Sequence, residues 1–221
     1  MARLARVVAP GVPHHVTQRG NRRQRTFFYD SDYRTYIKLL ADARISASVA
    51  IWAYCLMPNH VHLVVVPEHV DSLACMFGET HRRYTRRVNV REGWSGHLWQ
   101  ERFHSVVMDD SHVLAAVRYV ELNPVRAGLC SRPEQWPWSS ARAHLQGVDD
   151  RLARVAPMLE RVKDWQSYLG TEESPGTFRR LRTHTRTGRP IGDDDFVERL
   201  EKLTGHRLRR QKPGPKSEAS N

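Results

Sequence analysis

The sequence predicts an α+β protein built on a ferredoxin-like four-stranded antiparallel sheet with helices on one face. Between residues 14 and 122, β-forming runs and runs with helical spacing follow one another as strand, helix, strand, strand, helix, strand and helix. The first six elements have the split β-α-β order of that fold. The turn dipeptide Pro58-Asn59 separates the second strand from the third, so these two strands are expected to pair as a hairpin.

The first half of the chain supplies three strands and one helix. The strand candidates are rich in β-branched and aromatic residues and are bounded by turn-forming residues. In the helix, Tyr33, Tyr36 and Leu40 recur at helical spacing after Asp30 or Ser31, either of which can cap its N-terminus. The expected strands cover 14–19, 49–57 and 60–66, and the helix covers about 30–46.

A second helix is expected from Asp71 or Ser72 to the glycines at 93–96, with one apolar side and one arginine-rich side. The fourth strand is expected over His97–Met108. A third helix begins at about residues 109–111, and Asn123-Pro124 ends or kinks it.

The pattern weakens after Trp136-Pro137-Trp138, whose indoles are expected to be packing residues. Thr183–Pro190 has the composition of a loop, whereas Phe196, Leu200 and Leu203 predict one last amphipathic helix. The end of the chain is basic and contains proline and glycine, which is typical of a disordered tail. The expected parts are a main domain at 1–145, a helical extension at 146–206 and a basic tail at 207–221.

The charge balance favours a polyanionic partner. The 221 residues include 35 Lys+Arg and 24 Asp+Glu, a formal net charge of +11, so nucleic acid is the first candidate and an arginine-rich composition bias is the alternative. No apolar run approaches the ~20 residues of a membrane span, so no membrane partner is expected. Three scattered cysteines predict neither a disulfide framework nor a zinc-thiolate site, and a reducing cytoplasm is the expected location.

The strand predicted at 60–66 carries two histidines with one valine between them. His60 and His62 would point to the same face, because side chains alternate along a strand. Two imidazoles within an apolar sheet need a partner, and a divalent metal bound through neutral ring nitrogens would provide one. The alternative for such a pair taken alone is two partly exposed histidines on an edge strand.

A tyrosine near the end of the third helix gives the histidine pair a context. Asn123 follows Tyr119 by four residues, so the two share a face if the helix continues, although Pro124 biases Asn123 away from helical geometry. A tyrosine hydroxyl can attack phosphate when a metal polarises the phosphoryl oxygens, and Asn123 could supply a third, oxygen ligand. A half-buried helix tyrosine without chemistry is the alternative for Tyr119.

With these residues in place, the chain resembles the single-tyrosine (Y1) HUH transposases of the IS200/IS605 type, and most of all the REP-associated tyrosine transposases. The resemblance covers roughly residues 12–145, and its blocks come in the family's order. They are His15–Asn21, Met57–Leu63, Leu98–Phe103, Tyr119–Leu129 and Trp136–Ser140. The His-Val-His and Tyr-x3-Asn-Pro-Val-Arg-Ala-Gly blocks are specific together, whereas either alone is a weak signal.

The resemblance implies a metal-dependent nickase and strand transferase for single-stranded DNA, with 1–145 as its catalytic domain. It implies that Tyr119 attacks a backbone phosphate to give a 5′-phosphotyrosyl intermediate and a free 3′-OH. It also implies that His60, His62 and Asn123 bind Mg²⁺ or Mn²⁺, although the IS200-type enzymes carry glutamine where this chain has Asn123. The implied substrate is DNA with an imperfect hairpin of the repetitive extragenic palindrome kind, and the implied state is a monomer.

Basic side chains indicate where DNA would bind. One group follows the first strand, a second lies on the second helix, and Arg102 stands beside Trp99 and Phe103, which could stack on unpaired bases. The expected DNA-binding residues are Arg19, Asn21, Arg22, Arg23, Arg25, Arg82, Arg83, Arg86 and Arg102. A solvated surface or a packing role is the alternative for each group.

Two other classes of function stay open. One is a catalytically silent protein that binds a DNA hairpin by sequence. The other is a basic ferredoxin-like RNA-binding module, but such modules display aromatic residues on the sheet, where this chain has His60 and His62. The complete set of tyrosine, two histidines and asparagine favours an enzyme.

Overall fold

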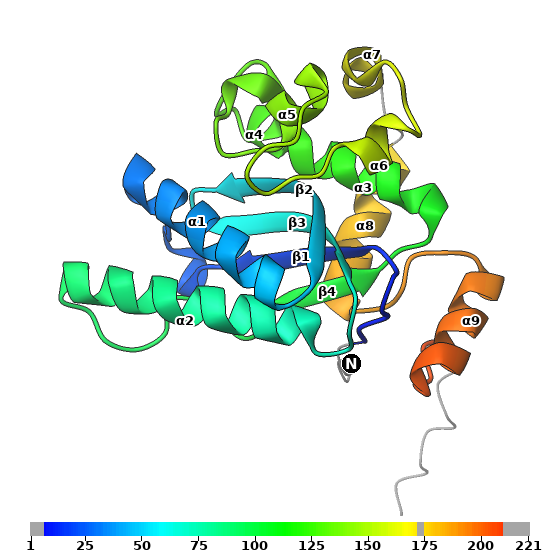
Figure 1. The fold of residues 1–221 in the computed structure, drawn as a ribbon, viewed down its shortest axis with the longest axis horizontal. Helices are drawn as coiled ribbons and strands as arrows, with labels where there is room; N and C mark the ends of the chain where they lie inside the picture. Colours follow the sequence, from blue (N-terminus) through cyan, green and yellow to red (C-terminus); the bar gives the residue numbers. More distant parts are fainter. Residues whose placement is uncertain (1–6, 172–174, 210–221) are drawn as a thin grey trace, which may run out of the picture.

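The computed structural model describes residues 7–171 and 175–209 (Figure 1). Its centre is a four-stranded antiparallel sheet in the order β2-β3-β1-β4. The strands are β1 (His14–Arg19), β2 (Val49–Met57), β3 (His60–Pro67) and β4 (His104–Val107). The predicted ferredoxin-like α+β class is confirmed, and β1 and β2 have the predicted limits.

One face of the sheet is covered by α1 (Asp30–Ser46) and α2 (Ser72–Glu92) (Figure 1). Val16 and Leu63 alternate onto this face and are fully buried against Tyr36 of α1 and Phe77 of α2. The period-two pattern of the strands and the helical spacing of α1 and α2 therefore meet in one apolar core.

The opposite face is covered as well, which adds a layer to the single-sided arrangement expected from the sequence. α3 (Asp110–Glu121) packs through Ala116 and Val117 against Ala53 and Val64 of the sheet. These strand residues are apolar and need cover as much as those of the other face do. The other helical elements are η1 (Asn21–Arg23), α4 (Asn123–Arg126), η2 (Pro133–Gln135), α5 (Ala141–Gln146), α6 (Ala156–Leu159), α7 (Trp165–Gly170), α8 (Pro175–Thr187) and α9 (Asp194–Thr204).

Two segments differ from the prediction. The strand expected over His97–Met108 is shorter in the structure and consists of β4 alone. The segment before β4 lies beside the end of β1 and the turn that follows it. There Asn21 N donates to Leu98 O and Gln100 N donates to Arg19 O, both at 2.8 Å. The segment at 183–190 was expected to be a loop, but α8 continues to residue 187, with backbone bonding that its polar composition did not indicate.

Residues 136–140 cover the free edge of β2. Leu56 N donates to Trp138 O at 2.8 Å, and the Trp136 indole donates to Leu56 O at 3.0 Å. The Trp138 ring stacks on Tyr33 of α1 with centroids 4.8 Å apart. The packing role predicted for the two tryptophans is confirmed, and it protects an edge strand from pairing with another chain.

A buried polar cluster ties the end of α3 to the C-terminal helices. The fully buried Glu121 carboxylate accepts hydrogen bonds from Ser140 Oγ at 2.7 Å, His144 Nδ1 at 2.6 Å and the Trp165 indole at 2.9 Å. Both carboxylate oxygens are therefore bonded, which is what makes such burial tolerable. The cluster fixes the segment that carries Tyr119.

The C-terminal part ends in α9, where the predicted amphipathic helix is confirmed and buries Phe196 and Leu200. No helix in the described ranges is both long enough and apolar enough to cross a membrane. The basic tail expected at 207–221 lies outside the described residues from 210 onward. The division into parts at 145 and 206 stays a prediction.

Candidate active site

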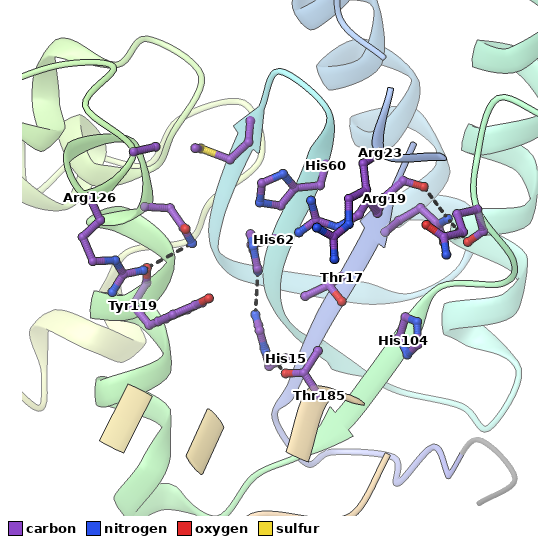
Figure 2. Close-up of a pocket in the computed structure, with 15 residues that line it drawn as sticks. His15, Thr17, Arg19, Arg23, His60, His62, His104, Tyr119, Arg126 and Thr185 are labelled. Atoms are coloured by element: carbon purple, nitrogen blue, oxygen red, sulfur yellow. Dashed lines mark hydrogen bonds between the residues drawn. The ribbon is translucent and has the colours of Figure 1, made fainter. Parts of the chain in front are cut away.

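A cleft of about 690 Å³ opens on the side of the sheet that faces α3. The register of β1 and β3 pairs Thr17 with His62 and Arg19 with His60, and residues paired in this way share a face. The prediction that the two histidines point to one face is confirmed. Figure 2 shows Tyr119 pointing from α3 toward this row, with Arg19 on the far side of the histidines in the same view.

Both histidines are held neutral by their surroundings. Burial, with Arg19 nearby, lowers the pKa of His60 to about 3. Burial, with His60 and His15 nearby, lowers the pKa of His62 well below its usual range. Their ring centroids lie 4.9 Å apart. A neutral imidazole keeps a ring nitrogen lone pair, which is the form that binds a metal ion.

Each of the two histidines uses its Nδ1 for a hydrogen bond within the protein. His62 Nδ1 lies 3.0 Å from His15 Nε2, and His60 Nδ1 lies 2.6 Å from Asn59 Oδ1. Nε2 is therefore the ring nitrogen that each histidine can offer to a ligand.

Tyr119 is held on several sides and is only 6% exposed. Its ring centroid lies 5.6 Å from that of His62 in an edge-to-face arrangement. The Arg126 guanidinium lies 4.2 Å from the Tyr119 ring centroid and 4.3 Å from that of Phe178 in α8. A side chain packed in this way is already oriented before substrate binds.

Asn123 stays beside Tyr119 although Pro124 follows it. Its Nδ2 donates to Tyr119 O at 3.2 Å, and Arg126 Nη2 donates to the same carbonyl at 2.8 Å. Because the amide nitrogen is used, Oδ1 is the Asn123 atom that can face a ligand. Tyr119 and Asn123 both line the cleft.

The predicted DNA-binding residues fall into separate places. Arg19 and Arg23 line the cleft. Three others lie on or just after the η1 turn and do not line the cleft: Asn21, Arg22 and Arg25. The remainder line hollows of about 620 and 650 Å³ along α2, on the other side of the sheet: Arg82, Arg83, Arg86 and Arg102. The structure thus does not bring this last group to the cleft.

Trp99 and Phe103, the candidates for base stacking, are only 7% and 8% exposed. The Trp99 ring lies 4.7 Å from that of His81 and the Phe103 ring lies 4.7 Å from that of Phe77, measured between centroids. The packing alternative is the one that the structure supports for both.

Several cleft residues were missed by sequence reasoning. They are the polar side chains of His15, Thr17, Gln18, Gln100, His104, Arg126 and Thr185. The alternation of β1 could have placed the first two beside Arg19 on one face. Thr185 has no such signal, because it comes from α8 and meets the sheet only in the folded chain.

Within the described residues, no three histidine, cysteine, aspartate or glutamate side chains converge as a metal-binding group. The metal site expected at His60, His62 and Asn123 therefore stays a prediction, although all three residues line the cleft.

The family model described as "Transposase IS200 like" matches residues 11–123, that is 113 of the 221 residues. The chain belongs to this family. The match includes the sheet, the histidine pair, Tyr119 and Asn123, so the resemblance drawn from the sequence blocks is confirmed. The chain is an enzyme of the tyrosine transposase class, whose members cleave DNA.

Two relatives place the similarity within one branch of the family. The REP-associated tyrosine transposase of Escherichia coli K12 is 21% identical over 120 residues, which cover 54% of this chain and 70% of that protein. A Haemophilus influenzae protein assigned to the same class is 27% identical over 123 residues, covering 51% of this chain and 68% of that protein. This transposase is thus similar to the REP-associated branch.

A solved structure shares the fold. A REP-associated tyrosine transposase bound to a REP hairpin superposes with a TM-score of 0.58 at 20% identity, covering 70% of this chain and 93% of that chain. The likeness supports the ferredoxin-like arrangement of the IS200-like transposase described above.

Proposed function

We propose that this IS200-like transposase cuts and rejoins single-stranded DNA beside a hairpin, with Tyr119 as the nucleophile. The observation that carries the proposal is one cleft in which Tyr119 lies edge-on to His62, 5.6 Å away between ring centroids, with His60 next to it. A tyrosine hydroxyl can attack a phosphate when a metal ion polarises the phosphoryl oxygens, and the two neutral imidazoles beside the Tyr119 ring could hold such an ion.

The proposed reaction conserves the number of phosphate ester bonds. The Tyr119 oxygen bonds to the phosphorus of a backbone phosphate, and the bond from phosphorus to the 3′ oxygen breaks. The products are a 5′-phosphotyrosyl enzyme and a 3′-hydroxyl, which takes up the proton that Tyr119 loses. Because the energy of the ester bond is kept in the intermediate, a 3′-hydroxyl can attack it and join strands without an external energy source.

The protein's own contribution to the chemical step is orientation. The Arg126 guanidinium packs between the rings of Tyr119 and Phe178 and also donates a hydrogen bond to the Tyr119 carbonyl. Both the side chain and the backbone of Tyr119 are therefore held in place. The Tyr119 side chain is nearly buried, and it lines the cleft that the scissile phosphate would enter. Orientation of this kind contributes by removing motions that the reaction would otherwise have to freeze.

The donor set fits a divalent cation. His60 and His62 would offer Nε2 to such a cation, and Asn123 would offer Oδ1. A mixed nitrogen and oxygen set without thiolate suits a divalent cation, and the resemblance to the family favours Mn²⁺ or Mg²⁺. When bound, such a cation supplies charge stabilisation at the scissile phosphate.

The cleft also offers positive charge for the DNA backbone. Arg19 and Arg23 lie beside the histidines, and their guanidinium groups suit phosphate contacts. The solved relative is bound to a REP hairpin, and we extend that substrate class to this chain. The arginines of α2 and Arg102 form a separate basic surface, to which we assign flanking DNA.

We also propose that one chain suffices for cleavage. Tyr119 and the histidines of β3 meet within a single chain, so no second copy is needed to complete the cleft. A monomer acting in cis is the arrangement that follows.

A denaturing-gel assay tests this function. Single-stranded oligonucleotides with a palindromic hairpin, labelled at the 5′ or 3′ end, would be incubated with the protein and Mn²⁺, beside Tyr119→Phe and a sample with chelator. The proposal predicts a protein-linked DNA product that only the native chain forms, and only with metal. Tight hairpin binding without any adduct would contradict it and would favour the silent hairpin-binding protein.

A further inference from the structure

The Nδ1 atoms of both cleft histidines are held by hydrogen bonds within the protein. His62 is bonded to His15 and His60 is bonded to Asn59, and each of these partners is itself bonded to a second group. Following the protons along both chains of hydrogen bonds determines which ring nitrogen carries hydrogen.

The first chain starts in α8. Thr185 donates its single hydroxyl proton to Leu181 O at 2.8 Å, so its oxygen can only accept from His15 Nδ1, which lies 3.3 Å away. His15 is 1% exposed, and a neutral imidazole with hydrogen on Nδ1 carries its lone pair on Nε2. It accepts from His62 Nδ1 at 3.0 Å, and this leaves the lone pair of His62 on Nε2.

The geometry of the two rings supports this bond (Figure 2). The planes of His15 and His62 differ by only 4°, and their centroids are 5.2 Å apart. The bonded nitrogens are closer to each other than the centroids are, so the rings meet edge to edge in one plane. That is the arrangement of a linear N–H···N bond and not of face-to-face stacking.

The second chain starts at the η1 turn. Asn59 Nδ2 donates to Arg23 O at 2.9 Å, which fixes the orientation of the amide. Asn59 Oδ1 therefore faces His60 Nδ1, 2.6 Å away, and can only accept. His60 carries its proton on Nδ1 and its lone pair on Nε2.

We propose that His15 with Thr185 and Asn59 with Arg23 are two tautomer-setting relays, which present Nε2 of both His62 and His60 to a divalent cation. The inference rests on the proposed function, because it assigns the positioning residues of the same site. Outer partners of this kind orient metal-binding histidines and typically change metal affinity about 10- to 100-fold when removed.

The relays give two distant segments a role in the site. α8 belongs to the part of the chain beyond the matched family region of 11–123, and the hydrogen bond of Thr185 to His15 connects it to His62. The η1 turn, which carries Arg23, reaches His60 through Asn59. Docking of α8 is therefore part of assembling the metal site.

The tautomers can be read directly by long-range ¹H–¹⁵N correlation NMR on the metal-free full-length chain. Both His60 and His62 are expected to carry hydrogen on Nδ1. In Thr185→Val, which keeps the shape of the side chain but removes the hydroxyl, the signals of His15 and His62 are expected to become those of mixed tautomers, with His60 unchanged. An Nε2–H form of His62 in the native chain would overturn the inference.

Metal affinity gives a second measurement that does not depend on DNA cleavage. Titration with Mn²⁺ is expected to show about 10-fold or greater weakening in Thr185→Val and recovery to within about threefold in Thr185→Ser. Thr183→Val is the matched control, because Thr183 makes the same bond to the carbonyl four residues back, at 2.9 Å, and is exposed. Equal Mn²⁺ affinity in the Thr185→Val and Thr183→Val variants would contradict the relay.

These outcomes are separable from those of the cleavage assay. If Tyr119→Phe still forms an adduct, the proposed nucleophile is wrong, whereas the tautomers are unaffected. If the native chain binds no Mn²⁺, the proposed metal dependence fails, and the NMR measurement alone decides whether the relays exist.

Discussion

The two faces of the sheet are built from the same strands but are stabilised in different ways. Toward α1 and α2, side chains such as Val16 and Leu63 are fully buried among apolar and aromatic groups. Toward α3 and α8, the neighbouring residues His15 and His62 are nearly as buried but are satisfied by directed hydrogen bonds.

The difference shows how function is added to a fold. An apolar face tolerates many combinations of side chains provided that its volume is filled. A polar face requires specific partners: here His62 is bonded to His15 of the neighbouring strand, and His15 to Thr185 of α8, far along the sequence. We expect substitutions on the first face to change stability and substitutions on the second to change chemistry.

The largest expected effect comes from two adjacent positions of β3. His62→Leu should reduce adduct formation about a thousandfold through loss of a ligand, and should lower the free energy of unfolding by only about 1 kcal/mol through loss of the hydrogen bond to His15. Leu63→Ala should lower the free energy of unfolding by about 2–5 kcal/mol through a core cavity, while the folded protein still forms the adduct. Chemical denaturation and the gel assay on both variants would test this, and equal losses of stability would contradict the division of roles.

The next effect concerns the polar cluster around Glu121. Glu121→Ala leaves the bonded groups of His144 and Trp165 without their acceptor, and should lower the free energy of unfolding by about 3 kcal/mol. Ser140→Ala removes one of the three bonds to Glu121 together with the acceptor of Tyr54 N, and should cost about 1–2 kcal/mol. Urea denaturation measures both, and equal costs for the two variants would argue against a carboxylate-centred cluster.

Buried histidines away from the cleft should make the fold sensitive to acid. Burial lowers the pKa of His81 to about 3 and that of His14 to about 4. Because unfolded histidine titrates near ~6.5, the unfolded chain binds these protons first, so stability is complete above that pH and is lost as the pH falls toward 4. The slope should be about 1.4 kcal/mol per pH unit for each histidine. Denaturation at several pH values should show a smaller slope for His81→Gln, and an unchanged slope would contradict this assignment.

A smaller effect is expected from the residue that clamps the nucleophile. Arg126→Ala removes the stacked cation and the bond to the Tyr119 carbonyl, and should slow adduct formation about tenfold. Single-turnover kinetics at saturating DNA measures the change. Arg126→Lys should recover only part of the rate, because ammonium does not stack as guanidinium does; full recovery would show that charge alone matters.

The smallest effect separates the two basic surfaces. Replacing Arg82, Arg83 and Arg86 together by glutamine should weaken DNA binding severalfold and reduce the salt slope by up to about 2, without changing the adduct yield at saturating DNA. Replacing Arg19 and Arg23 in the cleft should lower that yield. Fluorescence anisotropy over a range of salt concentrations, with the gel assay beside it, distinguishes the surfaces, and identical behaviour of both sets would contradict their separation.

The sequence predicted the features that depend on the alternation of residues along a strand. It missed several side chains of the cleft that meet only through contacts between distant segments. The limits of β1 and β2, and the shared side of His60 and His62, follow from local pattern alone. The contact of His15 with His62 depends on the register of β1 and β3, and a slip of one residue would turn the strand's other face to the cleft. Thr185 lies in a threonine- and arginine-rich segment whose pattern indicated a loop.

Mass spectrometry of the intact protein would test the central claim most directly. The chain would be incubated with a hairpin-bearing single-stranded oligonucleotide and Mn²⁺, weighed, and digested to locate any attached nucleotide. The account predicts one covalent DNA adduct on the peptide that contains Tyr119, absent with chelator. An adduct on another residue, or the same adduct in the presence of chelator, would contradict it.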